Sequence, residues 1–357
     1  MSLILGRKIG TVKKIMQESE AGMRVLFIGG TGNLSNACTQ WGLEKNIEIF
    51  HLNRGNRPEK TPAGVTSLKA DARRPDQVRD AVAGMRFDAV VQFLGFRREH
   101  VEADAEVFEE ITDQYVFISS ASAYRRPALT PVITESTPLG NPFWEYSRLK
   151  IDCEEALVRL GKERGFRYTI VRPSHTYDNG WIPSCFGSTD YGVAWRIREG
   201  RQVVVPGDGE SVWTLTHATD FAKGLVGLLG NPAAVGEAFH ITSDEFLTWN
   251  MIHAAIGAAL GASPRLVHVP SAFIARILPE RAAGLLGDKA TSAIFDNSKI
   301  RRFVPEFRPT VTFAEGIRRS LAWYDSHPEL KKPSPTVDGE MDKILDIWRK
   351  AEALTGR

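Results

Sequence analysis

The sequence predicts a protein of the α/β class whose centre is a doubly wound parallel sheet. Residues 25–28 are an apolar run typical of a buried strand, and a glycine-rich turn and a helical stretch follow them. Residues 47–52 have the composition of a second strand and complete a strand-helix-strand unit. Strands and helices then continue to alternate up to residue 173, as a doubly wound sheet requires.

The turn after the first strand reads Gly-Gly-Thr-Gly-Asn-Leu-Ser over residues 29–35. A glycine turn between a strand and a helix lets the pyrophosphate of a dinucleotide approach the backbone and sit at the helix N-terminus. Ser35 replaces the third glycine of the usual pattern and is small enough for close helix packing. The turn therefore predicts a Rossmann-type cofactor site with contacts from Gly29, Thr31, Gly32, Asn33 and Leu34.

The end of the second strand predicts which dinucleotide binds. An acidic side chain at this point commonly accepts the ribose 2′-hydroxyl of NAD. Here the chain carries Asn53 and Arg54 instead. Because an arginine can pair with a 2′-phosphate through two hydrogen bonds, we expect NADP to be preferred over NAD. The alternative is that Arg54 faces solvent and contacts no cofactor.

The middle of the chain supplies the remaining elements of the sheet and its covering helices. We expect helices at residues 76–83 and 100–110, buried strands at 88–94 and 116–119, and the sixth strand at 168–173.

Tyr146 and Lys150 lie one helical turn apart on the same face of a further predicted helix. Asn141 is a good N-cap and Pro142 suits the first helical position, so we expect the helix to begin there. A tyrosine titrates at about pH 10 in water, and a nearby ammonium group favours the phenolate. Lys150 is therefore expected to lower the pKa of Tyr146 so that the phenol can exchange protons near neutral pH.

Residues 116–124 form an apolar strand that ends in hydroxyl side chains, upstream of the Tyr146 helix. With the glycine turn, the hydroxyl-ended strand and the Tyr-Lys pair in this order, the chain resembles the extended short-chain dehydrogenase/reductase family, which includes NAD-dependent epimerases and dehydratases. The resemblance runs from about residue 23 to about residue 323. It implies catalytic roles for Ser120, Tyr146 and Lys150, with Ser122 as the fallback for the serine.

The resemblance also implies a division of labour among these residues. Tyr146 would exchange a proton with a substrate alcohol while hydride moves to or from the nicotinamide, and Ser120 would bond the same oxygen. Lys150 would hold the nicotinamide ribose as well as tune the tyrosine. Further cofactor contacts are expected from Asp71 at the adenine, from Leu94 and Gly95 after the fourth strand, and from Pro173.

One departure from the family pattern bears on the substrate. Members that bind nucleotide sugars often carry Gly-Asp-Gly followed by an Arg-Asp-Phe that helps to hold the pyrophosphate. This chain has the first motif at residues 207–209 but Trp-Thr-Leu at 213–215, so the expected arginine is missing. Either the substrate is not a nucleotide sugar or another arginine takes over, the candidates being Arg196, Arg198, Arg301 and Arg302.

The expected substrate contacts are Phe96, Ser122, Tyr124, His175 and Trp213. We expect an NAD(P)-dependent epimerase or dehydratase that acts on a sugar, nucleotide-activated in the favoured case, through a transient keto intermediate. The first alternative is an NADPH-dependent ketone or sugar reductase, which consumes its cofactor. A less favoured alternative is a non-catalytic nucleotide- or RNA-binding module on the same fold, since such a module has no need of Ser120, Tyr146 and Lys150.

The chain of 357 residues is long enough for a nucleotide-binding core and a smaller C-terminal substrate-binding region. We expect a peripheral extension at residues 1–22, the Rossmann core at 23–173, the substrate region with returning core elements at 174–330, and a tail at 331–357. Within the substrate region the cap is expected from residues 174–210, 240–285 and 292–313. The tail should contain a short peripheral helix at 341–354.

Composition excludes several other classes of protein. A net charge of +2 predicts no nucleic-acid partner, and no apolar run is long enough to span a membrane. Cys38, Cys153 and Cys185 have no metal-ligand spacing, so we expect no metal site and reduced thiols in a cytoplasmic protein. By resemblance we expect a homodimer in which the apolar back of residues 149–160 packs against a second copy.

Overall fold

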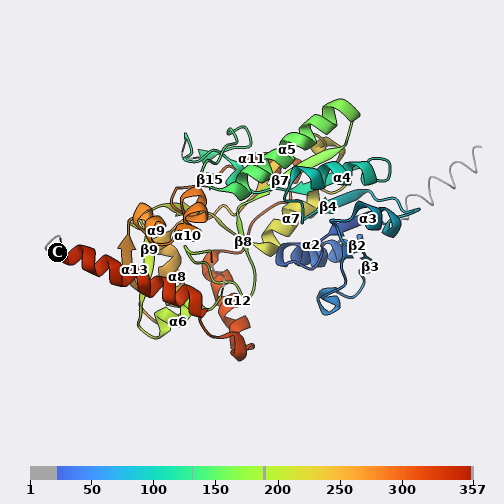
Figure 1. Cartoon of the computed structure of the whole chain (residues 1–357). Coiled ribbons are helices and arrows are strands. Elements are labelled where there is room, and N and C mark those ends of the chain that lie inside the picture. Colours follow the sequence, from blue (N-terminus) through green and yellow to red (C-terminus); the bar gives the residue numbers. More distant parts are fainter. Residues whose placement is uncertain (1–21, 131, 188–189, 355–357) are drawn as a thin grey trace, which may run out of the picture.

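The computed structural model describes residues 22–354, apart from residue 131 and residues 188–189. Its centre is a seven-stranded parallel sheet in the order β12-β7-β5-β4-β1-β2-β3 (Figure 1). The predicted doubly wound sheet is confirmed, and residues 168–173 do form its sixth strand along the chain. In chain order the strands of this sheet are β1 (Arg24–Ile28), β2 (Glu48–Asn53), β3 (Thr66–Lys69), β4 (Ala89–Gln92), β5 (Tyr115–Ile118), β7 (Tyr168–Pro173) and β12 (Ala238–Ile241).

Both faces of the sheet are covered by helices, because the side chains of each strand alternate between two apolar clusters. In β1, Val25 and Phe27 belong to one cluster and Leu26 and Ile28 to the other. The first cluster is closed by α2 (Asn33–Glu44), α7 (Ala218–Leu228) and α11 (Ser298–Phe303), and the second by α3 (Pro75–Ala81), α4 (Arg98–Phe108) and α5 (Glu145–Arg164).

The strand order reverses at β1, which pairs with β2 on one side and with β4 on the other. In an open α/β sheet this reversal opens a crevice outside the carboxyl ends of the strands, and ligands bind there. The glycine turn after β1, the hydroxyl residues after β5 and the first turns of α5 all lie at this edge.

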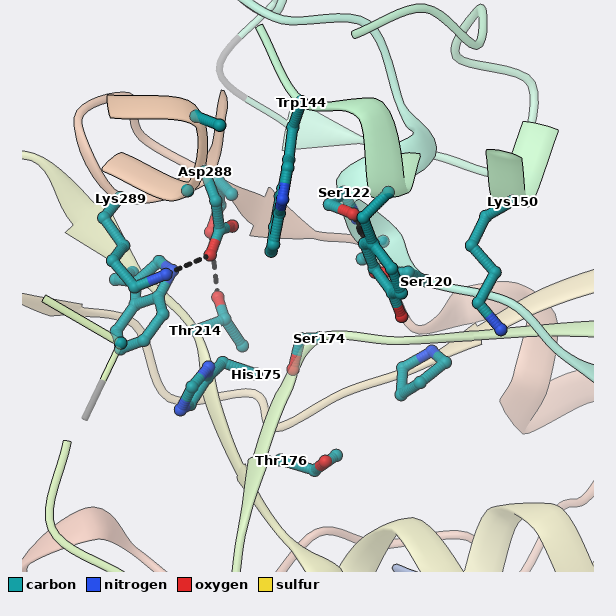
Figure 2. A pocket seen from close by; sticks show the side chains of 18 of the residues that line it. Ser120, Ser122, Trp144, Lys150, Ser174, His175, Thr176, Thr214, Asp288 and Lys289 are labelled. Atoms are coloured by element: carbon teal, nitrogen blue, oxygen red, sulfur yellow. Dashed lines mark hydrogen bonds and ion pairs between the residues drawn. The ribbon is translucent and has the colours of Figure 1, made fainter. Parts of the chain in front are cut away.

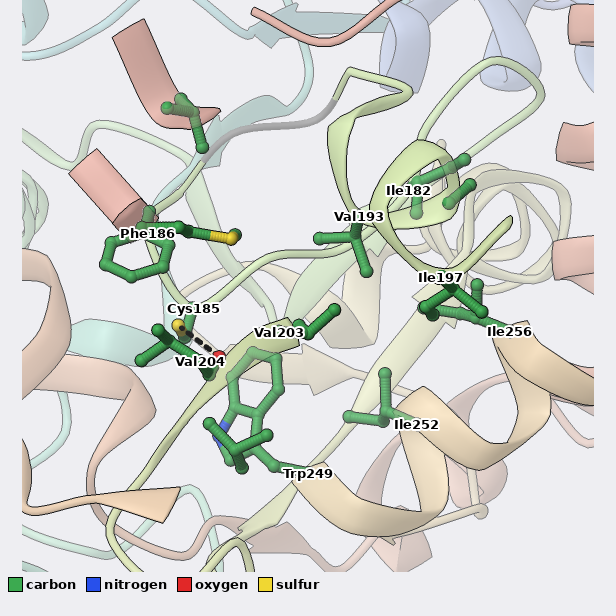
Figure 3. Close-up of a cluster of buried hydrophobic side chains, with 14 of the residues drawn as sticks. Ile182, Cys185, Phe186, Val193, Ile197, Val203, Val204, Trp249, Ile252 and Ile256 are labelled. Carbon is green, nitrogen blue, oxygen red and sulfur yellow. Dashed lines mark hydrogen bonds between the residues drawn. The ribbon is translucent and has the colours of Figure 1, made fainter. Parts of the chain in front are cut away.

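A second group of elements packs around its own apolar cluster, beyond the carboxyl edge of the sheet (Figures 1 and 3). Figure 3 shows Trp249 and Ile252 packed between strand and helix side chains such as Val203 and Ile197. Besides the main sheet and the helices that cover it, the structure contains β6 (Val132–Ile133), β8 (His175–Tyr177), α6 (Gly192–Arg198), β9 (Gln202–Pro206), β10 (Val212–Trp213), β11 (Leu215–His217), β13 (Leu247–Thr248), α8 (Trp249–Leu260), β14 (Arg265–Val269), α9 (Ser271–Ile277), α10 (Pro279–Gly284), β15 (Ile294–Phe295), α12 (Phe313–Asp325) and α13 (Pro335–Leu354).

The predicted start of the Tyr146 helix was wrong by one turn. Helix α5 begins at Glu145 with Trp144 as its N-cap residue. Asn141 is buried instead, and its Nδ2 donates to the carbonyl oxygens of Ser122 and Gly287, both at 2.8 Å. The amide was therefore diverted from helix capping because it joins two loops that are far apart in sequence.

Part of the predicted cap belongs to the sheet. Residues 240–241 lie in β12, which pairs in parallel with β7. Ile300, Val304 and Phe307 are buried in the apolar cluster on one face of the sheet. Assigning these residues to the cap was wrong, because their side chains close the sheet rather than the second cluster.

The C-terminal helix is neither short nor peripheral. Helix α13 spans 20 residues and buries Met341, Ile344 and Leu345 in the second apolar cluster. Asp338 and Asp342 of this helix form ion pairs with Arg196 and Arg201. The predicted N-terminal extension, residues 1–22, lies outside the described residues except for Gly22.

The apolar positions of α5 that were expected to meet a second copy are used within the chain. Cys153, Ala156, Leu157 and Leu160 are buried against the chain's own sheet. This face is therefore not free for a partner, and the homodimer stays a prediction.

Across the part of the chain that the structure describes, none of the helices has both the length and the apolar composition that crossing a lipid bilayer requires.

We expect Ile344→Ala to lower the free energy of unfolding by about 2–5 kcal/mol, because Ile344 is fully buried and its truncation leaves a cavity. The matched control is Ile347→Ala on the same helix, whose side chain is 36% exposed and whose loss should cost about 1 kcal/mol or less. Urea unfolding of both variants makes the comparison. Equal stability of the two variants would mean that α13 is not docked as described.

Candidate active site

Ser120, Tyr146 and Lys150 come together at one cavity of about 530 Å³, between the carboxyl edge of the sheet and the second apolar cluster. Ser120 directly follows Ser119 at the end of β5, while Tyr146 and Lys150 lie in the first two turns of α5. The Ser120 and Ser122 Oγ atoms are 2.8 Å apart, and Ser147 Oγ donates to Ser122 Oγ at 2.8 Å. The cavity thus brings together the serine, the phenol and the ammonium group that the sequence singled out. Figure 2 shows Ser120 and Lys150 on the same side of Trp144.

The ammonium group of Lys150 is almost completely buried and is held by two backbone carbonyls. Its Nζ donates to Gly95 O at 2.6 Å and to Ile118 O at 2.7 Å. It also lies 4.7 Å from the ring centroid of Phe96 and 4.8 Å from that of Phe117. Burial lowers the pKa of Lys150 to about 8.

The expected effect of Lys150 on the Tyr146 pKa is not realised in this arrangement. Burial raises the pKa of Tyr146 above its ordinary value, a hydrogen bond with Ser120 opposes the rise, and the carboxylate of Asp288 adds to it. Lys150 Nζ lies 5.8 Å from the centroid of the tyrosine ring. The expectation was wrong here because the two carbonyls take the ammonium group toward the strand ends.

Ser35 explains why the glycine turn works without its third glycine. Its buried hydroxyl donates to Gly29 O at 2.8 Å and accepts from Gly32 N at 3.0 Å. Gly29 has a φ of 88°, and a Cβ there would lie 2.5 Å from Leu94 Cγ. The buried hydroxyl of Ser35 therefore holds the turn in place. Part of the surface stays exposed at Thr31, Gly32, Asn33 and Leu34.

The end of β2 carries an exposed basic side chain and no carboxylate. Asn53 Oδ1 accepts from Gly55 N at 2.8 Å, which turns the chain, and Arg54 is exposed. Among the described residues Arg54 has neither an ion pair nor a side-chain hydrogen bond. Asp71 Oδ1 accepts from Arg73 N at 3.0 Å in the next strand-end turn.

The remaining expected cofactor positions lie along the same crevice. Leu94 packs on Gly29, and Gly95 is so close to Phe117 that a Cβ would lie 2.7 Å from its ring. Phe96 is 38% exposed at the cavity, 6.3 Å from Tyr146 between ring centroids. Pro173 and Leu34 also line the cavity.

On the substrate side, His175 and Trp213 form an aromatic wall with Trp181. The His175 ring is stacked on Trp181 at 4.4 Å and lies 4.2 Å from Trp213, and Trp213 is stacked on Trp249 at 4.6 Å. Burial and the neighbouring Lys289 lower the pKa of His175 to about 3, so that the ring is neutral. The position where an arginine was expected is thus occupied by an indole in a stack.

Tyr124 does not reach the cavity, and its assignment as a substrate contact was wrong. Its ring is fully buried, and its hydroxyl lies 3.1 Å from both Arg172 Nη1 and His240 Nδ1. Arg172 in turn forms a buried ion pair with Glu154 at 2.6 Å. The phenol belongs to this internal network because buried polar groups need partners.

The arginines expected to replace the missing one lie elsewhere. Arg196 is buried under α13 in its pairs with Asp338 and Asp342, and Arg301 pairs with Asp244. Arg198 and Arg302 are likewise absent from the described lining of the cavity.

The cavity-lining side chains that sequence reasoning missed include Trp144, Arg126, Asp288 and Lys289. Asp288 and Lys289 lie on the π-helical turn Leu285–Lys289, and Lys289 Nζ is 3.2 Å from Asp288 Oδ2 (Figure 2). Lone π-helical turns are frequent at functional sites, but no local sequence pattern predicts them. Trp144 had a local signal, since it lies two residues before Tyr146.

The sequence model of the NAD dependent epimerase/dehydratase family matches residues 25–242. The chain belongs to this family and is an enzyme of the short-chain dehydrogenase/reductase type.

Among curated proteins, the chain is 28% identical to the 2′-dehydrokanamycin reductase of Streptomyces kanamyceticus, over 82% of each chain. It is 24% identical to a chloroplast stem-loop binding protein of 41 kDa from Arabidopsis thaliana, over 69% of this chain and 65% of that one. Among solved structures, it resembles the UDP-glucuronic acid 4-epimerase of Bacillus cereus, in complex with UDP-glucuronic acid and NAD. That likeness has a TM-score of 0.67 at 16% identity and covers 85% of this chain and 100% of the other.

We expect Ser35→Ala to lower the free energy of unfolding by about 1–3 kcal/mol, because it leaves Gly29 O and Gly32 N without their buried partner. Ser326→Ala is the control, since that hydroxyl is exposed and its loss should change stability by about 0.5 kcal/mol or less. Chemical denaturation measures both. A Ser35→Ala protein as stable as the control would contradict the described role of the hydroxyl.

Proposed function

We propose that the protein is an NADP(H)-dependent reductase that interconverts a ketone and a secondary alcohol on a ring-shaped substrate without a nucleoside diphosphate. The observation that carries the proposal is the cavity itself: Ser120, Tyr146 and Lys150 stand at one end, and the stacked indole of Trp213 stands where a phosphate-binding arginine was expected. An indole in a stack offers apolar contact to a ring, but it cannot pair with a diphosphate through two hydrogen bonds as the expected arginine would.

The turn at residues 29–32 fits a dinucleotide. Helix α2 spans 12 residues and has no acidic side chain in its first turn. The first N–H groups of a helix have no acceptor within the helix, so they can bind an anion. Gly32, Asn33 and Leu34 would hold the pyrophosphate, Asp71 the adenosine half, and Lys150 with Pro173 the nicotinamide half. When bound, the reduced nicotinamide supplies a hydride.

NADP is favoured over NAD by the end of β2. Arg54 is exposed and unpaired among the described side chains, so that its guanidinium is available to a 2′-phosphate. Asn53 carries no negative charge that would repel this phosphate. The NAD bound to the Bacillus cereus epimerase is a property of that protein, and its fold alone is shared.

The proton comes from this chain's own residues. Tyr146 would give its phenolic proton to the carbonyl oxygen as a C–H bond forms at the carbonyl carbon and the π electron pair moves to oxygen. A tyrosine titrates at about pH 10 in water and burial raises the Tyr146 pKa further, so the phenol holds its proton at neutral pH. Ser120 would donate a hydrogen bond to the same oxygen.

The similarity to the Streptomyces protein supports the proposed reductase, since the name of that protein describes the reduction of 2′-dehydrokanamycin. The second candidate is an epimerase or dehydratase of a nucleotide-activated sugar. It is favoured by the fold shared with the Bacillus cereus epimerase over the full length of that chain. Both candidates use the same proton-transfer residues but differ in the fate of the cofactor.

Cofactor consumption separates the two candidates. The purified protein is mixed with NADPH and a panel of ring ketones that includes keto-pyranosides, and the loss of NADPH absorbance is followed. We expect stoichiometric oxidation of NADPH with at least one ketone. Conversion of UDP-glucose or UDP-glucuronic acid with no net change of nicotinamide would instead establish the second candidate.

We expect Tyr146→Phe to reduce kcat by about 10²–10⁴-fold while the protein stays folded, because only the acidic hydroxyl is removed. The control is Tyr168→Phe, a tyrosine of β7 outside the described cavity lining, which should keep its activity. Steady-state rates and circular dichroism are measured for both. Undiminished turnover in Tyr146→Phe would remove the phenol from the mechanism.

We expect Arg54→Ala to raise the Kd for NADP by about tenfold to a hundredfold, because hydrogen bonds to a charged group contribute about 1.5–3 kcal/mol. The Kd for NAD should not change, which makes NAD the internal control. Arg265→Ala, an exposed arginine of β14, should alter neither value. Fluorescence titration supplies the constants, and an equal loss for both nucleotides would refute the role of Arg54.

A further inference from the structure

The cavity carries a second set of charged side chains, at the end away from Lys150. It consists of Arg126, Asp288 and Lys289, which we call the charged wall. Figure 2 shows Asp288 and Lys289 beyond Trp144, on the other side of that ring from Lys150. Arg126 is 3% exposed and Lys289 is 5% exposed, so both cations are largely withdrawn from bulk water.

The charges of this wall do not balance. Asp288 faces both cations: Lys289 Nζ lies 3.2 Å from its Oδ2, and Arg126 acts on it through the Coulomb attraction that helps keep it ionised. His175, which is also close to Asp288, is neutral. Two cations and one carboxylate therefore leave an excess of one positive charge in a shielded place.

The other charged residues of the lining do not remove this excess. Lys150 is bound to two carbonyls at the opposite end of the cavity. Arg281 is paired with Glu340 of α13 at 3.1 Å, and Glu280 is exposed to solvent, which screens its charge. The positive excess of the charged wall is thus uncompensated within the described chain.

Some hydrogen-bond donors of the charged wall also lack an acceptor among the described residues. Arg126 Nη1 donates to Ser292 O at 3.4 Å, and its buried Nε has no hydrogen-bond partner among the described residues. Lys289 has three N–H donors, of which Asp288 accepts one. Its Nζ lies 5.3 Å from the ring centroid of Trp213 and 5.7 Å from that of Trp144. Burying such a cation without a full set of partners costs free energy that an anion would offset.

We propose that the charged wall binds one oxyanionic group of the substrate, a carboxylate or a phosphate monoester, attached to the ring that is reduced. Lys289 donates to this group between the Trp144 and Trp213 rings, while Arg126 and Asp288 balance one another behind it. The inference rests on the proposed function, because it names the class of ring ketone that the cavity accepts.

The test uses the full chain and simple ring probes that differ only in charge. Isothermal titration calorimetry compares cyclohexanecarboxylate, cyclohexyl phosphate, cyclohexanol and cyclohexylamine. We expect at least one anionic probe to bind about tenfold or more tightly than cyclohexanol, which corresponds to about 1.4 kcal/mol. The carboxylate and the phosphate, compared with one another, identify which oxyanion the wall accepts.

Three variants assign the preference to the wall. Lys289→Met should abolish the preference for anions, and Lys289→Arg should retain it. Asp288→Asn should strengthen anion binding, because it raises the positive excess from one charge to two. The control is Lys299→Met: Lys299 is also paired with a carboxylate, Glu237, and lies over the ring of Phe239, but it is outside the cavity lining.

The proposal is overturned if neither anion binds more tightly than cyclohexanol, if the amine binds most tightly, or if Lys289→Met keeps the preference. It is also overturned if Lys289→Met and Asp288→Asn weaken anion binding equally, which is the pattern of a purely structural role. Melting temperatures confirm that the variants are folded. If the protein reduces ketones but shows no preference for anionic probes, this inference alone is wrong. If it prefers anionic probes but does not bind NADPH, the proposed function is wrong.

Discussion

The position of helix α5 on the sheet is the constraint on which the site depends. Two buried charged residues, one helical turn apart, fasten this helix to the carboxyl ends of the strands. Lys150 bonds the carbonyl of Ile118, the last residue of β5, and that of Gly95, just after β4. Glu154 accepts from Ser119 and pairs with Arg172 of β7. Since an unpaired buried charge is very costly, the helix has little freedom to slide or rotate.

The cavity exists because two apolar cores meet at this edge without filling it. The sheet supplies the hydroxyl residues after β5, and the second cluster supplies the stack of Trp213, Trp249 and His175. Asn141 links the two sides, since its amide bonds both Ser122 O and Gly287 O. The distance between the proton-transfer residues and the π-helical turn is thereby set by hydrogen bonds rather than by loop length.

The C-terminal helix extends this support to the far wall of the cavity. Helix α13 is pinned by Arg196 and Arg201 on one side, and its Glu340 holds Arg281 of α10 on the other. Helix α10 leads directly into the turn that carries Asp288 and Lys289. Helix α13 therefore contributes to the shape of a site that the family match at residues 25–242 does not fully contain.

The sequence by itself determined the parts of this protein whose signals are local. The alternation of strands and helices follows from short apolar runs and glycine turns, and the Tyr146–Lys150 spacing follows from helical periodicity. Tertiary structure alone decided what depends on contacts between distant segments. It turned Tyr124 inward to Arg172 and His240, took Asn141 away from its capping role, and brought Asp288 and Lys289 to the cavity. A buried polar group takes whichever partner packing brings near, and no local pattern of residues records that partner.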